Sequence, residues 1–108
     1  MDIPNEILNA LGGERFLAMT GVNNLVGYGN TLRMKIPRNM SKANRLWITL
    51  DGDDTYTVRF FRFKAGGIDK RTYVFKGEKT TEVYQASGVY FDQLREIFTR
   101  ITGLYTHL

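Results

Sequence analysis

Cationic and aromatic side chains recur at alternate positions in three segments near the middle of this 108-residue chain. One residue separates Arg33 from Lys35, and one residue separates Arg59 from Phe61. Because successive side chains of a β-strand point to opposite faces, this spacing predicts that cations and rings share one face of a sheet. The residues predicted on that face are Arg33, Lys35, Trp47, Thr49, Arg59, Phe61 and Phe63.

A face of this kind can bind single-stranded nucleic acid, because rings stack on bases at about 1–3 kcal/mol per base while cations contact phosphates. The segment from Arg33 to Lys79 has 12 Lys or Arg and 5 Asp or Glu, a net charge of +7, whereas the remainder has 3 and 6, a net charge of −3. A basic centre suits an anionic partner, although a solvated sheet surface has a similar composition. The polar loop in this segment supplies three further candidate binding residues, Arg38, Lys42 and Arg45.

The same rings also have a purely structural interpretation. Aromatic residues make up 13% of the chain, and a domain of this size must bury most of them. The predicted face could therefore be covered by the N-terminal helices, by a sheet edge or by a second subunit. Both interpretations stay open at the level of the sequence.

Other chemistry is not indicated by the residue pattern. The run Asp51-Gly52-Asp53-Asp54 begins like a calcium loop, but Arg62 stands at the twelfth position, where a bidentate glutamate belongs. Neither glycine pair is followed by Gly-Lys-Ser/Thr, and the one histidine, His107, lies next to the terminus. The chain has no cysteine. We expect no catalytic residue, no metal, no cofactor and no enzymatic activity.

The elements that must position the basic aromatic face begin with helices. Ile3, Ile7, Leu8 and Leu11 form an apolar stripe that ends at Gly12-Gly13. Residues 14–20 could be a strand, but Ala18, Met19 and the following Gly21 favour a second helix. The apolar stripe Tyr90, Leu94, Ile97, Phe98 and Ile101 predicts a final amphipathic helix over residues 89–104.

Between these helices the apolar period changes to two, which predicts strands. Turn residues separate the strands, notably Gly29-Asn30, Asp51 to Asp54, Gly66-Gly67 and Gly77. Residues 71–76 and 80–85 are expected to be joined by a turn around Gly77. The predicted strands are residues 24–28, 31–36, 45–50, 55–64, 71–76 and 80–85.

The pattern as a whole predicts one α+β domain over residues 1–108. A single antiparallel sheet would carry short N-terminal helices and the C-terminal amphipathic helix, which packs on its aliphatic face. That face would consist of Leu32, Met34, Ile36, Leu46, Ile48, Leu50, Val58 and Phe60.

Three stretches resemble a family of small uncharacterised proteins from bacteriophage and prophage genomes. They are residues 11–21 (LGGERFLAMTG), residues 48–50 with 55–60 (ITL and TYTVRF), and residues 88–94 with 102–106 (GVYFDQL and TGLYT). The resemblance implies a mobile-element origin and expression inside a bacterial host. It implies no activity or catalytic residue.

Two functional classes follow, and both suit a phage accessory protein. One is a nucleic-acid-binding module that uses the basic aromatic face. The other is a protein-binding module that modulates a host or phage protein, or a homodimer joined through that face. The N-terminal residues lack the regions of a signal peptide and no apolar run approaches the length of a bilayer span, so we expect a cytoplasmic protein without membrane contact.

Overall fold

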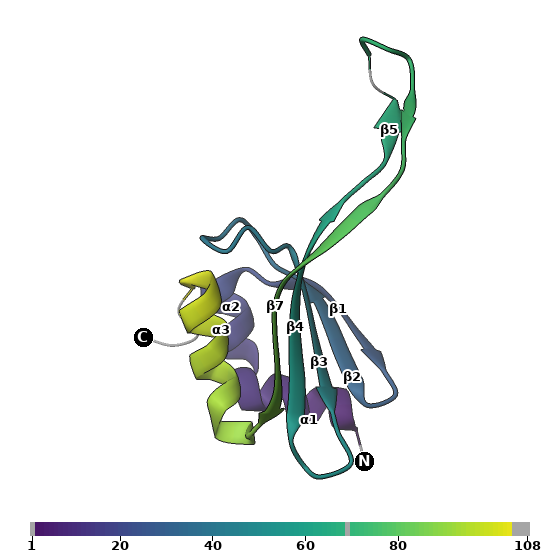
Figure 1. Ribbon diagram of the computed structural model, residues 1–108. Coiled ribbons are helices and arrows are strands. Elements are labelled where there is room, and N and C mark those ends of the chain that lie inside the picture. The colour runs from purple at the N-terminus through teal and green to yellow at the C-terminus, as the bar shows by residue number, and fades with distance from the viewer. Residues whose placement is uncertain (1, 69, 105–108) are drawn as a thin grey trace.

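The chain folds into one five-stranded antiparallel sheet with helices on one face (Figure 1). The computed structural model describes residues 2–68 and 70–104. The strand order is β1-β2-β3-β4-β7, and the predicted α+β fold is confirmed. The strands are β1 (Asn23–Tyr28), β2 (Thr31–Lys35), β3 (Arg45–Leu50), β4 (Tyr56–Lys64), β5 (Gly67–Ile68), β6 (Phe75–Lys76) and β7 (Lys79–Val89). The helices are α1 (Ile3–Leu11), α2 (Glu14–Thr20), the 3-10 turn η1 (Phe91–Gln93) and α3 (Leu94–Thr102).

Helix α1 begins with a side-chain cap and lies close against strand β1. The Asp2 carboxylate accepts a hydrogen bond from the Asn5 backbone N–H at 3.2 Å, which satisfies one of the free donors at the helix start. Pro4 occupies the first turn of this helix, where a missing N–H costs nothing. A Cβ atom at Gly27 would lie only 2.8 Å from the Pro4 ring. Glycine at this position of β1 therefore permits the helix to dock.

Helices α2 and α3 end in the same way, at a threonine followed by a glycine. The hydroxyl groups of Thr20 and Thr102 each donate to the carbonyl four residues earlier, at 2.7 Å. Each hydroxyl also accepts a backbone N–H from the residue after the glycine. Gly21 and Gly103 take the left-handed conformation that ends a helix, with φ of 73° and 75°. The predicted helix over residues 14–20 is confirmed.

The core lies between the helices and the aliphatic face of the sheet. Its centre is a cluster of three fully buried phenylalanines. Two come from the helix layer, Phe16 from α2 and Phe98 from α3, and one, Phe60, comes from strand β4 of the sheet. Phe98 meets Phe16 edge-to-face at a centroid distance of 4.9 Å and lies 6.5 Å from Phe60. The aliphatic face predicted from the period of two is thus the face that receives the helices.

The prediction that the last helix begins at residue 89 is wrong. Strand β7 runs through Val89, which pairs with Tyr56 of β4, and α3 begins only at Leu94. Gly88 has φ of 66°, and the Gln93 side chain accepts the Tyr90 N–H at 2.9 Å. The chain therefore changes direction between residues 88 and 93, before helix α3 begins. Tyr90 is 61% exposed and is not part of the packed stripe.

The prediction of a strand over residues 71–76, joined to the next strand by a turn at Gly77, is also wrong. Only β6 is strand in that range, and it pairs back with β5, while β7 pairs with β4. The chain therefore passes through Gly77 without reversing. The result is a ribbon that extends β4 and β7 away from the sheet, and Figure 1 shows it projecting from the body. We call residues 65–68 and 70–78 the arm.

Candidate nucleic-acid interface

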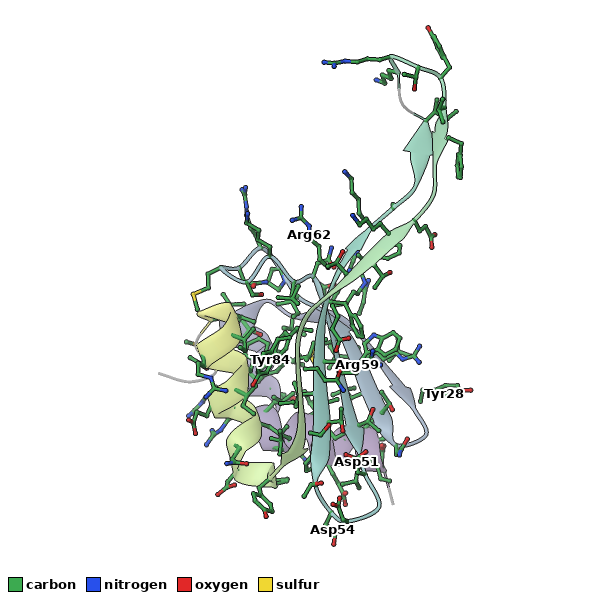
Figure 2. All side chains as sticks on the ribbon, viewed as in Figure 1. Tyr28, Asp51, Asp54, Arg59, Arg62 and Tyr84 are labelled. Atoms are coloured by element: carbon green, nitrogen blue, oxygen red, sulfur yellow. The ribbon has the colours of Figure 1, made fainter. Side chains whose placement is uncertain are left out.

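The basic aromatic residues lie on the sheet face that faces away from the helices. The strand register sets them side by side: Arg33 is opposite Trp47, Trp47 is opposite Arg59, and Arg45 is opposite Phe61. In Figure 2, Arg59 and Tyr28 point to the side opposite Tyr84, which contacts α3 through a hydrogen bond from Arg100. We call Arg33, Lys35, Arg45, Trp47, Arg59, Phe61 and Phe63 the open face.

Trp47 lies at the centre of the open face with a neighbour on each side. The guanidinium carbon of Arg33 lies 4.0 Å from the Trp47 ring centroid, which is a cation–π distance. The Phe61 ring meets the Trp47 ring edge-to-face at 5.0 Å. Phe61 is only 7% exposed, so it supports Trp47 from below and offers no ring of its own to a ligand.

Two further cations on the open face also lie over rings. Arg59 is 4.8 Å from the Phe61 centroid, and its guanidinium contacts the Glu82 carboxylate at 3.5 Å. Arg45 is 5.2 Å from the Phe63 centroid and donates to the Asn44 carbonyl at 3.0 Å. The open face is thus a layer of cations on a layer of rings, and only Arg59 has an ion-pair partner among the described residues.

Lys35 and Arg45 oppose each other directly on neighbouring strands. Like charges in that position destabilise a sheet, because their side chains lie within about 4.5–5.5 Å at Cβ. No ion pair to either residue is present in the described part of the chain. An anion between the two side chains would relieve this repulsion.

A groove runs along this part of the open face. Its volume is about 470 Å³, which lies within the range of about 300–1,000 Å³ typical of small-ligand sites. Polar and apolar groups both line it, and it reaches from the β1 edge to the start of the arm. The lining residues are Asn24, Val26, Arg33, Met34, Lys35, Arg45, Trp47, Phe61, Phe63 and Thr80.

Two of the predicted site residues, Arg38 and Lys42, do not join the open face. Their loop is tied to the helix layer, since the Met40 N–H donates to the Thr102 carbonyl of α3 at 3.2 Å. The Asn39 side chain braces the loop from within by donating to the Ala43 carbonyl at 2.7 Å. Both cations are exposed, but neither lines the groove.

Sequence reasoning missed two contributors to the site. Tyr28 is 71% exposed, and its ring centroid lies 5.7 Å from the Arg33 guanidinium. The turn at Gly29-Asn30 could have indicated this, because it folds β1 back beside Arg33. Asn44 was also missed, and its side-chain amide pairs with both backbone groups of Phe63, at 2.7 and 2.8 Å. No sequence signal marks that role.

The turn between β3 and β4 places acidic groups at the end of the sheet opposite the arm (Figure 2). The Thr55 hydroxyl and then the Thr55 N–H donate to the Asp53 carboxylate, and these bonds hold the pKa of Asp53 below its ordinary value. This is an Asx turn, which accounts for the acidic run without a bound ion. The described residues contain no group of three or more potential metal ligands.

None of the helices within residues 2–68 and 70–104 combines the length and apolar character needed to cross a membrane. A comparison of the chain with protein-family models, curated proteins and solved structures finds no match. The resemblance to phage and prophage proteins therefore stays a prediction.

Proposed function

We propose that this chain is a non-enzymatic protein that binds single-stranded nucleic acid on the open face. The observation that carries the proposal is the groove itself. There, cations without an ion-pair partner among the described residues surround a supported tryptophan, on a sheet face that none of the described helices covers. Cations supply contacts to phosphates, and an aromatic platform supplies stacking to any base. Both needs of a single strand are met within one groove.

Trp47 is the stacking residue in this proposal. Its edge is held by Phe61, so the ring is fixed before a ligand arrives and little side-chain entropy remains to be lost. Arg33, Lys35 and Arg45 are the phosphate contacts. A base that takes the place of the Arg33 guanidinium on the ring would free that cation for a phosphate.

The cellular setting of the proposal is the cytoplasm of a bacterial host, where the chain serves as a phage or mobile-element accessory protein. The resemblance of residues 11–21 to phage and prophage proteins supports this setting. In the structure those residues supply a core phenylalanine and the Thr20-Gly21 pair that ends helix α2, so they belong to the framework of the fold and not to the open face.

The chain has one tryptophan, and it lies in the groove, so its fluorescence reports on occupancy of this site. We expect thymidine oligonucleotides to quench the emission of Trp47 at low salt. The logarithm of the affinity should fall linearly with the logarithm of salt concentration, by about 0.7 for each phosphate contacted. Arg33→Ala or Lys35→Ala should make that slope shallower by about the same amount.

Trp47→Ala should act differently, because it removes stacking and not charge. Binding measured by anisotropy of a labelled oligonucleotide should weaken by about 1–3 kcal/mol at every salt concentration. Arg95→Ala, which removes an exposed cation from α3, is the matched control and should leave both affinity and slope unchanged. Absence of binding to single- or double-stranded nucleic acid at low salt would overturn the proposal in favour of a protein partner or a homodimer.

A further inference from the structure

The arm presents apolar and aromatic side chains to solvent far from the core. Ile68 and Phe75 form a cross-strand pair and are 66% and 71% exposed, although such pairs are normally covered in a sheet. Tyr73 is 84% exposed and has φ of 58°, a left-handed conformation that aromatic residues rarely adopt. An arm that served only to connect β4 to β7 would require none of these rings.

The arm and the two lysines at its root are also basic. Residues 64–79 contain five Lys or Arg and two Asp or Glu, a net charge of +3. At the root of the arm, Lys64 of β4 lies directly opposite Lys79 of β7. This is a second like-charge pair across neighbouring strands, which destabilises the ribbon unless an anion lies between its members.

The groove on the open face leads to the root of the arm. Phe63 and Thr80 both line the groove, and they are opposite each other one position before the Lys64 and Lys79 pair. Arg62, at the same root, is exposed. Because successive side chains of a strand point to opposite faces, the Lys64–Lys79 pair lies on the face of the ribbon opposite to the groove. A ligand that leaves the groove toward the arm therefore reaches this second cationic pair by passing around the edge of the narrow two-stranded root.

The opposite direction is electrostatically unfavourable. The β3–β4 turn at the far end of the sheet carries Asp51, Asp53 and Asp54, and Figure 2 shows two of these, Asp51 and Asp54, at the end away from the arm. A polyanion on the open face is repelled by this turn and attracted by the arm. The charge distribution therefore favours a path for the bound nucleic acid that leaves the groove toward the arm and not toward the β3–β4 turn.

We propose that a single strand bound in the groove passes around the root of the arm and continues along it, where phosphates contact Lys64 and Lys79 and further bases stack on Tyr73 and Phe75. This inference depends on the proposed function of the open face and extends its site. Charge also argues against a second copy of the chain meeting face to face at this site, because both the arm and the open face are basic. Nucleic acid complements both surfaces at once.

The length of the arm sets the expected site size. From the Lys64–Lys79 pair to the Ile68–Phe75 pair the ribbon has five residues on each side. This length reaches about 17 Å and matches about five stacked nucleotides at about 3.4 Å each. The groove alone is lined from all five strands of the sheet. Because these strands are about 4.8 Å apart, the groove accommodates about five nucleotides. A dodecanucleotide should therefore engage both surfaces, whereas a tetranucleotide should engage the groove alone.

The experiment compares thymidine tetra- and dodecanucleotides on the full chain, by quenching of Trp47 and by anisotropy. In the double variant Tyr73→Ser and Phe75→Ser, affinity for the dodecanucleotide should fall at least about tenfold, while affinity for the tetranucleotide should not change. Because both side chains are highly exposed, the variant should fold as the original chain does. Phe91→Ser, at a 53% exposed ring beside α3, is the control and should alter neither affinity.

Four outcomes would overturn the inference. Equal loss of affinity for both oligonucleotides would show that the arm changes the groove and does not itself contact the nucleic acid. An unchanged affinity for the dodecanucleotide, with Trp47 still quenched, would remove the arm from the site while the proposed function stands. Sedimentation that shows a dimer dissociated by Phe75→Ser would assign the arm to a second copy. Failure of both oligonucleotides to bind the original chain would end the proposed function as well.

Discussion

Asn44 links the central sheet to the arm by acting as an extra strand residue. Its backbone N–H donates to the Phe61 carbonyl at 2.8 Å, which continues the β3–β4 ladder by one position. Its side-chain amide then reaches Phe63, donating to the carbonyl and accepting from the N–H. An asparagine amide carries the same donor and acceptor as a peptide group, so the ladder continues without further backbone.

We expect Asn44→Ala to lower the free energy of unfolding by about 1–3 kcal/mol, because both backbone groups of Phe63 lose their partner. Asn44→Asp keeps an acceptor for the Phe63 N–H but sets its second carboxylate oxygen against the Phe63 carbonyl, so it should also destabilise the protein. Urea denaturation measures both losses, and amide exchange at Phe63 should quicken in Asn44→Ala, where the acceptor of the Phe63 N–H is removed. Asn9→Ala, at an exposed position in α1, is the control; a loss there as large as that of Asn44→Ala would contradict the assignment.

At the scale of elements, the stability of the fold depends on how α3 meets the sheet. Leu94, Ile97 and Phe98 are buried along one side of this short helix. Phe98 contacts a ring from α2 and lies near another from β4, so one side chain joins both layers. A nine-residue helix is marginal by itself in water, and this packing accounts for its formation.

Phe98→Ala should therefore destabilise the protein by about 3–5 kcal/mol, through lost contacts and the cavity that remains. Thermal or urea unfolding gives the value directly. Phe91→Ala, three residues before the buried stripe begins, removes a 53% exposed ring and should change stability by less than about 0.5 kcal/mol. Comparable losses in the two variants would show that the core is elsewhere.

Local patterns predicted helices α1 and α2 and the first four strands well. The alternation of Leu32, Arg33, Met34 and Lys35 assigned two faces of β2, and the structure has the aliphatic pair buried and the basic pair exposed. The glycines at positions 66, 67 and 77 were interpreted as breaks between short strands. They are instead points along one ribbon, because β5 and β6 pair with each other across the arm, which local periodicity does not encode.

The sequence predicted which residues of the candidate site share one sheet face, but it did not predict how their side chains pack against one another. A period of two places Trp47 and Phe61 on one side of the sheet, yet it does not distinguish an available ring from a supporting one. That difference comes from the packing of Trp47, Arg59 and Phe61 against one another across strands. Arg38 and Lys42 were grouped with the face by charge alone, and the bond from Met40 to α3 holds their loop elsewhere.

The arm lengthens the molecule as a whole but adds no residue to its hydrophobic core. The molecule measures 49 × 32 × 21 Å, and Figure 1 shows the arm extending it in one direction. The buried hydrophobic residues of the described chain come from the helices, the sheet and the connecting residues Val22, Ile36 and Ala43, and none comes from the arm. Segments with few buried contacts open most readily in native proteins.

We therefore expect limited digestion with trypsin to cut first at Lys70 and Arg71, which are exposed and lie in the turn of the arm. Denaturing gel electrophoresis should show two fragments of about two thirds and one third of the chain. Size-exclusion chromatography under native conditions should show a single species of the original size. Early cuts at cations within β2 or β4 would contradict this view of the arm.

The nicked protein would hold together through the pairing of β4 with β7 and the burial of α3 against Phe16 and Phe60. The same division should work when the chain is made in two pieces. A polypeptide ending near residue 70 and another beginning near residue 72 each carry half of an interface that only the other completes. Because the break near residue 71 lies outside the core, the two pieces should reassemble on mixing. A reporter attached at either new end would then turn this small domain into a split sensor for a ligand of the open face.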